Sequence, residues 1–359
     1  DFFEMFDFLP VNTGRKSVLQ SLEAGKQALA DGKALCLFPE GVLTRSGFMN
    51  EFKSGFQRVL KGNEDASVLP IYMGGTWGST FSLRSGERLS LTNTAGPLPP
   101  KISVHVGEVV PHDIPALELW EKVKELEFID HKIRADENVP GPVKFLHHAK
   151  FNPFGSIFID PDKGPIKNLP LLIKVLALSA KIKKVQGKKE YTSILLPNTV
   201  AAVSTALAAY FQESVPVFLN STVSKDGLAH ALKTTDCQHV ITSKLAIKKM
   251  NIDLPDTCTP IYLEDIAKSI TKVDVIKSLI SIARPSHWIC KARIDDTATI
   301  LFSSGSTGTP KGVELTHLNV SSNLDSLGMV CDLNQNDVVL GHMPLFHAFG
   351  YLSAFYLPI

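Results

Sequence analysis

The sequence has few cysteines, and none of the spacings that make a metal site or a disulfide framework. It contains five cysteines in 359 residues, scattered along the chain and without a Cys-x-x-Cys pair. An odd, scattered set of this kind is typical of buried or free thiols in a reducing compartment. We therefore expect neither a disulfide-stabilised secreted domain nor a zinc site, and no metal-ligating residues are predicted.

A marked net charge is also absent. The chain has 37 Lys and Arg residues against 36 Asp and Glu residues, which leaves a formal charge of +1. This balance implies no polyelectrolyte partner, so we expect no nucleic-acid binding. The local exception is residues 181–189, which hold five lysines. Such a run is most often a solvated face, and contact with an anionic membrane surface or an acidic carrier protein stays open.

An uncharged run of membrane-spanning length is found from Tyr191 to Gln212. It contains Pro197, Asn198 and Thr199, which interrupt any continuous apolar helix. The pattern therefore favours a buried strand, a turn and a buried helix. The chain also begins without Met or a signal peptide and ends in an apolar stretch, so we expect it to be an internal fragment.

Two series of alternating strand and helix patterns divide the chain, and this alternation predicts an α/β fold class. The first series covers residues 1–135 and includes a short apolar strand over Ala34–Phe38 and a charged helix over Leu117–Arg134. Residues 136–168 hold several Pro and Gly residues with little periodicity, which predicts a linker. The second series covers residues 169–359.

A Gly/Ser/Thr loop with one lysine follows the strand predicted over Thr297–Phe302. Its glycines permit positive φ and close backbone approach, and successive backbone N–H groups form a nest for anions. The spacing is not that of a Walker A loop. A flexible surface linker is the alternative, but strand patterns enter and leave the segment. We predict that ATP phosphates are bound by Ser303, Ser304, Gly305, Ser306, Thr307, Gly308, Thr309 and Lys311.

This loop resembles the signature of the adenylate-forming superfamily, which includes acyl-CoA and acyl-carrier-protein synthetases. Residues 344–350, Pro-Leu-Phe-His-Ala-Phe-Gly, resemble a second motif of that family. There the histidine, here His347, sits beside the acyl group and the ATP phosphates. Leu195–Asn198 and Val217–Asn220 resemble its early core strands.

The resemblance implies ATP and Mg²⁺ as cofactors and a fatty acid as substrate. The carboxylate would be activated as acyl-AMP and passed to a thiol of acyl carrier protein or CoA. The family's later motifs, with the catalytic lysine, are expected beyond Ile359. We therefore expect this chain to bind ATP weakly and to make no acyl-AMP by itself.

A second polar loop, Phe38–Gly47, reads Phe-Pro-Glu-Gly-Val-Leu-Thr-Arg-Ser-Gly. Arginine and backbone donors suit a phosphate monoester, although an ordinary polar strand-to-helix loop is the alternative. The segment resembles a block of the glycerophospholipid acyltransferases, as does Val68–Tyr72 downstream. The resemblance implies acyl-acceptor binding by Glu40, Gly41, Thr44 and Arg45. The basic residue that commonly follows Pro-Glu-Gly in that family is absent here.

The catalytic His-x₄-Asp motif of those acyltransferases is expected upstream of Asp1. One match occurs within the chain, from His131 to Asp136. It follows the acceptor block and lies at the end of a charged helix, so we do not expect it to be catalytic. The catalytic residues of both activities are thus expected outside this chain.

The domain order resembles that of bifunctional bacterial enzymes that join acyl-carrier-protein synthetase to 2-acylglycerophosphoethanolamine acyltransferase. It implies the C-terminal part of an acyltransferase α/β domain, then the N-terminal half of an adenylate-forming α/β domain. The resemblance also implies a lysophospholipid as the acyl acceptor and a location at the cytoplasmic face of the inner membrane. One alternative is a CoA-dependent synthetase fused to a lysophosphatidate acyltransferase. Another is a non-catalytic lipid- or nucleotide-binding scaffold.

Overall fold

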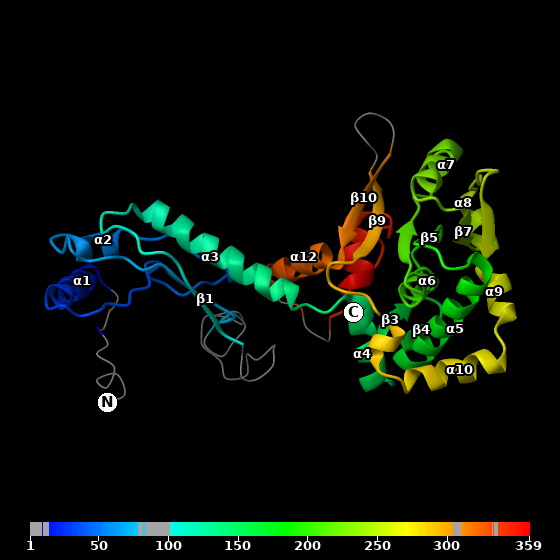
Figure 1. Cartoon of the computed structure of the whole chain (residues 1–359), viewed down its shortest axis with the longest axis horizontal. Helices are drawn as coiled ribbons and strands as arrows, with labels where there is room; N and C mark the ends of the chain where they lie inside the picture. The colour runs from blue at the N-terminus through cyan, green and yellow to red at the C-terminus, as the bar shows by residue number, and fades with distance from the viewer. Residues whose placement is uncertain are drawn as a thin grey trace. The chain divides into compact units, whose positions relative to one another are not determined.

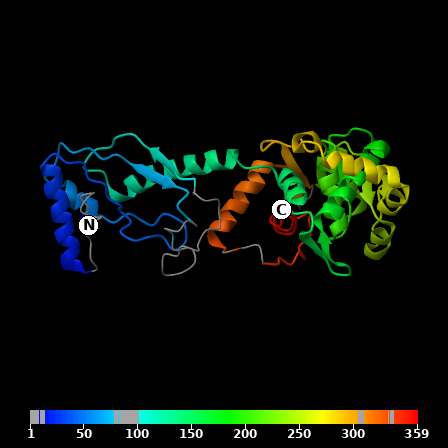
Figure 2. The same cartoon turned by 90° about the horizontal axis from the view of Figure 1, so that it is seen from below.

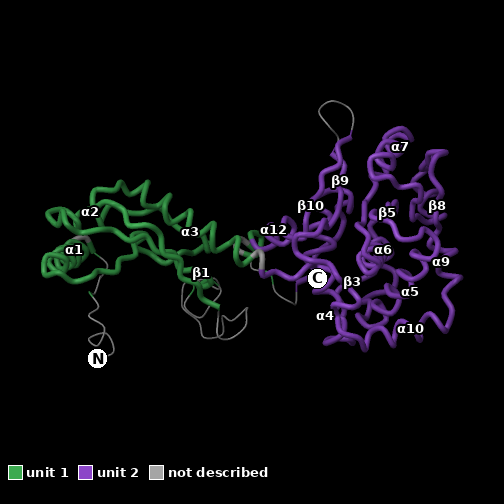
Figure 3. The backbone as a smooth tube through the Cα atoms, viewed as in Figure 1, with its two compact units in different colours: residues 1–134, 326–335 green, residues 135–325, 336–359 purple. Residues whose placement is uncertain are grey.

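The computed structural model describes residues 9, 14–77, 82, 101–303, 310–331, 333 and 337–359 (Figure 1). The chain forms two compact units, coloured separately in Figure 3. Unit 1 comprises residues 1–134 and 326–335, and unit 2 comprises residues 135–325 and 336–359. Both units contain helices and strands, and in unit 2 they alternate from α5 to α9, so the predicted α/β class is confirmed.

Unit 1 is built on a small apolar core. Its elements are α1 (Arg15–Ala30), α2 (Gly55–Leu60), β1 (Ile71–Gly74), β2 (Ser103–Val106) and α3 (Ala116–Asp136). Phe56 and Leu60 of α2 pack with Ile114 and Leu119, which lie just before and within α3. These contacts hold the short helix against the long one.

The antiparallel pair β1 and β2 turns its polar side chains toward α3. Ser103 and His105 both contact Asp130 of that helix. Met73 and Val104, which lie opposite each other in the ladder, are exposed. Val106 is exposed as well, so the aliphatic side chains of β2 face away from α3 and its polar side chains face the helix.

The strand expected over Ala34–Phe38 is not formed. These residues are irregular, and Phe38 is largely exposed. A strand needs a neighbour to satisfy its backbone, and no strand in the described part of the chain pairs with this segment. A short apolar run alone does not specify a strand.

Residues 136–168 form regular structure where the sequence predicted a linker. They contain α4 (Gly141–Phe151) and a hairpin of β3 (Ser156–Asp160) and β4 (Gly164–Lys167). Phe145, Leu146 and Ala149 are fully buried in the largest core of unit 2. The Pro and Gly residues that suggested a linker lie at the ends of these short elements, where they cap and turn the chain.

Unit 2 contains a six-stranded sheet between layers of helices (Figure 1). Its further elements are α5 (Asn168–Gln186), β5 (Tyr191–Ile194), α6 (Val200–Tyr210), β6 (Val215–Phe218), α7 (Lys225–Thr234), β7 (His239–Thr242), α8 (Lys244–Met250), β8 (Thr259–Tyr262), α9 (Leu263–Ser269), α10 (Lys272–Ile282), α11 (Ser286–Ile289), β9 (Thr297–Ser303), β10 (Lys311–Thr316), α12 (His317–Val330), α13 (Ala348–Gly350) and the π-helix η2 (Tyr351–Tyr356).

The strand order is β10-β9-β6-β5-β7-β8, with β10 antiparallel and the other five parallel. Because side chains alternate along a strand, neighbouring residues enter different cores. Phe218 and Leu301 join the core that contains α4, α5 and α6, whereas Val217 and Ile300 join the core beneath α7. Both faces of the sheet are therefore covered, as parallel strands require.

The uncharged run of Tyr191–Gln212 forms β5 and α6, as predicted from its Pro and Asn residues. Nearly every side chain of α6 is buried, which explains why this helix is apolar around its whole circumference. Among the residues that the structure describes, no helix is long and apolar enough to cross a membrane.

Candidate functional site

One edge of the large sheet gathers the segments that the sequence singled out in unit 2. Strands β5, β6 and β9 are parallel, so their carboxyl ends lie at the same edge. Strand β5 leads into Asn198, β6 into Asn220, and β9 ends at Ser303. Ligands of open α/β sheets bind outside this edge. We therefore take it as the candidate site of unit 2.

The predicted phosphate loop connects β9 to β10 in a hairpin. Lys311 lies directly opposite Ser303 in the ladder, and the Ser303 hydroxyl donates to the Lys311 carbonyl at 3.4 Å. The Lys311 side chain is exposed. The structure thus brings the first and last predicted phosphate ligands together at the mouth of the hairpin. Ser304, Gly305, Ser306, Thr307, Gly308 and Thr309 lie outside the described residues.

A histidine of α7 fixes the second strand of this hairpin. The His230 Nε2 atom lies 3.0 Å from the carbonyl oxygen of Pro310, so this ring nitrogen donates the hydrogen bond. The contact holds the backbone immediately before Lys311 against α7. The two partners are 80 residues apart, so no local pattern in the sequence points to His230.

The side chain of Asn198 clamps the segment that leads to His347. Its amide nitrogen donates to the carbonyls of Gly341, at 3.2 Å, and Met343. Its amide oxygen accepts from the Leu345 N–H at 3.0 Å. Both amide hydrogens and the oxygen are thereby used. Residues 341–345 are consequently held at the carboxyl end of β5.

His347 follows this clamp and begins α13. Its carbonyl accepts from the Tyr351 N–H at 2.8 Å, and its ring lies 4.8 Å from that of Phe346, measured between centroids. The side chain is exposed. The structure therefore fixes the backbone of His347 and leaves its imidazole exposed.

A buried cluster of tyrosines supports α13 and η2 from below. The hydroxyls of Tyr210 and Tyr351 lie 2.6 Å apart, and both contact the carbonyl of Ala298. Tyr356 bonds the Nδ1 atom of His317. Burial raises the pKa of all three tyrosines well above the ordinary value, and burial lowers the pKa of His317 to about 4. The side chains of the cluster are thus uncharged near neutral pH, and their hydrogen bonds hold α13 and η2 against the core.

In unit 1, the predicted acceptor loop is held by Glu40. Its Oε2 atom accepts from the backbone N–H of Asn50 at 2.7 Å and from the Asn50 amide at 3.0 Å. The Trp120 indole of α3 donates to the Asn50 carbonyl at 3.1 Å. Glu40 is therefore committed to shaping the loop. Gly41 follows it with φ of 66°, a conformation that glycine adopts readily.

Thr44 shapes the tip of the same loop. Its hydroxyl donates to the Phe48 carbonyl at 2.7 Å and accepts from the Gly47 N–H at 3.1 Å. Gly47 has φ of 83°, and a Cβ there would lie 2.9 Å from the Trp77 ring. Arg45 is exposed at this tip. Of the four predicted acceptor ligands, Glu40 and Thr44 organise the backbone, while Arg45 presents a cation.

A lysine that sequence reasoning missed also approaches this loop. The Lys53 backbone N–H donates to the Pro39 carbonyl at 2.9 Å. Its ammonium lies over Gly41, where an added Cβ would be 3.1 Å from Nζ. Lys53 thus supplies a basic group close to the Pro-Glu-Gly turn. Because Lys53 is not adjacent to this turn in the sequence, local spacing does not point to it.

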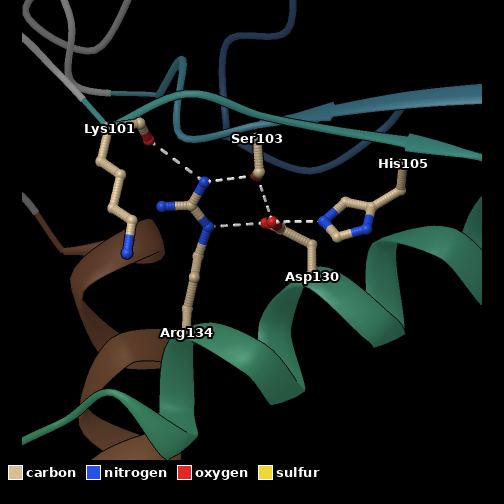
Figure 4. A network of polar contacts seen from close by, with 5 residues as sticks. All are labelled: Lys101, Ser103, His105, Asp130 and Arg134. Carbon is tan, nitrogen blue, oxygen red and sulfur yellow. Dashed lines mark hydrogen bonds and ion pairs between the residues drawn. The ribbon is translucent and has the colours of Figure 1, made fainter.

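A polar network beneath the sheet of unit 1 is centred on Asp130, whose side chain is 3% exposed (Figure 4). The carboxylate contacts Ser103, His105 at 2.9 Å and Arg134 Nε at 2.7 Å. Burial alone would raise the pKa of Asp130, but hydrogen bonds from Arg134, Ser103 and His105 outweigh it and lower the pKa. Arg134 also donates to the Lys101 carbonyl at 3.2 Å. The network fastens α3 to β2.

Among the described residues, no group of three His, Cys, Asp or Glu side chains is placed to hold a metal ion.

Comparison with known proteins gives matches for both parts of the chain. The family model described as acyltransferase matches residues 1–74. The plant oxalate–CoA ligase of Arabidopsis thaliana is 28% identical over 176 residues, 46% of this chain and 32% of the relative. The peroxisomal long chain acyl-CoA synthetase 7 of that plant is 38% identical over 74 residues, 20% of this chain and 11% of the relative.

Among solved structures, o-succinylbenzoate CoA synthetase from Bacillus subtilis, in complex with ATP and magnesium ion, aligns with a TM-score of 0.47 and 19% identity. The alignment covers 61% of this chain and 55% of that one. This structural similarity is too low to support a family assignment.

The match that decides the family covers the carboxyl-terminal part of the chain. The chain spans about a third of the length of the first curated relatives that it matches. The family model described as AMP-binding enzyme matches residues 174–359, which is more than half of the chain. This range includes the hairpin of Ser303 and Lys311, the Asn198 clamp and His347. The chain therefore belongs to the family of AMP-binding enzymes.

Proposed function

We propose that the protein activates a fatty acid with ATP and transfers the acyl group to a lysophospholipid. Unit 2 would bind ATP and the fatty acid, and unit 1 would bind the phosphate of the acyl acceptor. The observation that carries the proposal is the convergence of Ser303, Lys311 and the Asn198-held segment before His347 at one sheet edge.

The chemistry proposed for unit 2 is an adenylyl transfer. A carboxylate oxygen of the fatty acid forms a bond to the α-phosphorus of ATP, and the bond to the β-phosphate oxygen breaks, which releases pyrophosphate. Lys311 suits the phosphate chain because a cationic donor strengthens a hydrogen bond to an anion. The described residues offer no carboxylate cluster for Mg²⁺, so the ATP phosphates would supply most of its ligands.

The thiol that takes the acyl group defines two versions of this function. Acyl carrier protein is the acceptor that we propose, and the protein would then work at the cytoplasmic face of a bacterial inner membrane. CoA is the second candidate, because the similar curated proteins are named as CoA ligases. In the complete protein, ATP-dependent acylation of purified carrier protein but not of CoA would support the first version.

ATP binding by unit 2 is testable in the chain itself. We expect Lys311→Ala to weaken the binding of Mg²⁺-ATP about tenfold in calorimetry, because a charge-assisted hydrogen bond is lost. Lys249→Ala on α8 removes another exposed lysine and should leave the affinity unchanged. Equal affinities for the Lys311 variant and the original chain would contradict the assignment.

The acceptor role of unit 1 rests on Arg45 of the loop and on Lys53, whose ammonium lies beside Gly41. Arg45→Ala and Lys53→Ala should each weaken binding of a soluble short-chain lysophospholipid about tenfold. Lys61→Ala, at the end of α2, is the matched control. Binding that survives the removal of both cations would refute headgroup recognition here and leave ATP binding by unit 2 untouched.

A further inference from the structure

Helix α10 of unit 2 turns its aliphatic residues outward. Ser278 is buried, and its hydroxyl donates to the carbonyl of Asp274. Val273, Ile276 and Ile280 follow the i, i+3, i+7 spacing of one helix face, and they are 57%, 55% and 58% exposed. A surface helix normally buries its apolar side and exposes its polar side. On α10 the aliphatic residues are exposed, and the one buried side chain is that of Ser278.

The orientation of α10 is fixed by polar contacts at the start of the helix. Thr271 and Asp274 form a capping box, and the Asp274 carboxylate also pairs with Lys181 of α5 at 2.9 Å. The backbone N–H of Thr271 and the Lys181 ammonium hold the pKa of Asp274 well below its usual range. Rotating α10 to bury its aliphatic residues would break the pair between Asp274 and Lys181. The apolar face is therefore a stable feature of the surface.

Large exposed aromatic residues lie on the elements that adjoin α10. Trp288 of α11 is 65% exposed, and Phe151 and Phe154, at and after the end of α4, are 86% and 80% exposed. Helix α11 contacts both α10 and α4. Lys150 Nζ donates to the Arg284 carbonyl at 2.6 Å, which joins α4 to the segment between α10 and α11. These elements run along one side of unit 2 (Figures 1 and 2).

Basic residues outnumber acidic ones around this face. Residues 268–293 contain six lysine and arginine residues and one acidic residue, Asp274, which is paired with Lys181. Lys291 and Arg293 pair with Glu213 and Asp296, which leaves Lys268, Lys272, Lys277 and Arg284 as the basic residues of the face. Lys272 and Lys277 of α10 are exposed beside the aliphatic residues. Lys183 and Lys184 extend the basic character from the last turn of α5, the helix against which α10 packs. A basic rim around an apolar face complements an anionic surface.

We propose that the outer face of α10, with Trp288 and the end of α4, is a docking surface for a membrane of anionic phospholipids. Aliphatic and aromatic side chains would enter the boundary between headgroups and acyl chains, and the lysines would contact the phosphates. A second copy of this chain fits less well, because a two-fold contact would bring the same lysines together. This membrane contact is separate from the proposed acyl-transfer chemistry, and vesicle binding can be measured without ATP or fatty acid.

The test is cosedimentation of the chain with vesicles of phosphatidylcholine, with and without phosphatidylglycerol. We expect binding to the anionic vesicles that weakens with salt, and little binding to the neutral ones. Ile276→Glu should reduce the binding about tenfold, since it removes an aliphatic contact with the bilayer and adds a negative charge that the anionic lipids repel. Leu245→Glu on α8, where Leu245 is 58% exposed, is the matched control and should bind as the original chain does.

The lysines provide a second comparison. Lys277→Glu should weaken vesicle binding about tenfold, whereas Lys249→Glu on α8 should change it little. Circular dichroism would establish that each variant is folded. Equal binding by the Ile276 and Leu245 variants, or no binding by the original chain, would overturn the proposal. A dimer that Ile276→Glu dissociates would assign the face to a second copy, and binding to acidic carrier protein alone would assign it to that partner.

Discussion

The Asn198 side chain accepts a hydrogen bond from the Leu345 N–H at 3.0 Å, across 147 residues of sequence. Asn198 belongs to the Leu-Leu-Pro-Asn segment after β5, and Leu345 belongs to the motif that contains His347. Two motifs that the sequence offered as separate resemblances are thus joined by one side chain. The bond explains how the backbone before His347 is held at the sheet edge where the phosphate loop begins.

Replacing Asn198 with Ala should loosen this segment. The carbonyls of Gly341 and Met343 and the N–H of Leu345 would lose their partner, and we expect a loss of about 1–3 kcal/mol in unfolding free energy. Hydrogen exchange followed by mass spectrometry should show faster exchange at residues 343–351. Asn220→Ala removes only a local turn contact with Thr222 and should leave those residues protected. Unchanged protection in the Asn198 variant would contradict the clamp.

Replacing Asp130 with Asn should destabilise unit 1 by about 2–4 kcal/mol, because Arg134 and His105 lose a buried anionic partner. Urea unfolding followed by Trp77 and Trp120 fluorescence, in a Trp288→Phe background, reports on this unit. Glu125→Gln breaks an exposed pair with Lys122 and should cost less than about 0.5 kcal/mol. Similar midpoints for the two variants would show that the network contributes little.

The lowered pKa of Asp130 also predicts a pH dependence. Because the folded value lies below the unfolded one, the stabilisation is present above about pH 4 and is lost as the pH falls through the folded pKa. The urea midpoint of unit 1 should therefore drop in acid for the original chain and less for Asp130→Asn. A parallel acid response in both proteins would rule out Asp130 as the titrating group.

His317 predicts a second acid effect, this time in unit 2. Its pKa is lowered by burial to about 4, so between that value and its ordinary pKa of 6.5 the unfolded chain binds a proton that the folded chain does not. Stability should thus fall as the pH drops through this window, by about 3 kcal/mol in total. His317→Asn should lack this decline in urea unfolding followed by circular dichroism, whereas His287→Asn, at an exposed position, should retain it.

Gly47 and Gly32 provide a matched pair for the acceptor loop. Both have positive φ, but a Cβ on Gly32 meets nothing within 4 Å, while one on Gly47 would lie 2.9 Å from the Trp77 ring. Gly32→Ala should cost about 1 kcal/mol from backbone strain alone. Gly47→Ala should cost about 1–3 kcal/mol more because of the overlap. Urea unfolding in the Trp288→Phe background compares them, and equal losses would argue against tight packing at Trp77.

Long-range contacts account for the places where prediction and structure differ. The Ala34–Phe38 run has the composition of a strand, but no described strand pairs with it. The sequence of residues 136–168 lacks periodicity because Pro and Gly mark the ends of short elements. The burial of Phe145 and Leu146 depends on packing against α5 and α6, which the local sequence does not reveal. His230 and Lys53 were missed because each acts on a distant or non-adjacent backbone segment.

The sequence by itself determined the α/β class, the strand and helix of Tyr191–Gln212, and the chemical character of the Ser303–Gly312 and Phe38–Gly47 loops. These follow from local periodicity and from the backbone freedom and charge of particular residues, which neighbours in sequence set. Tertiary structure alone decided that β2 turns Ser103 and His105 toward Asp130, that Asn198 holds the segment before His347, and that α10 faces outward. Each depends on partners that only the folded chain brings within hydrogen-bonding or packing distance.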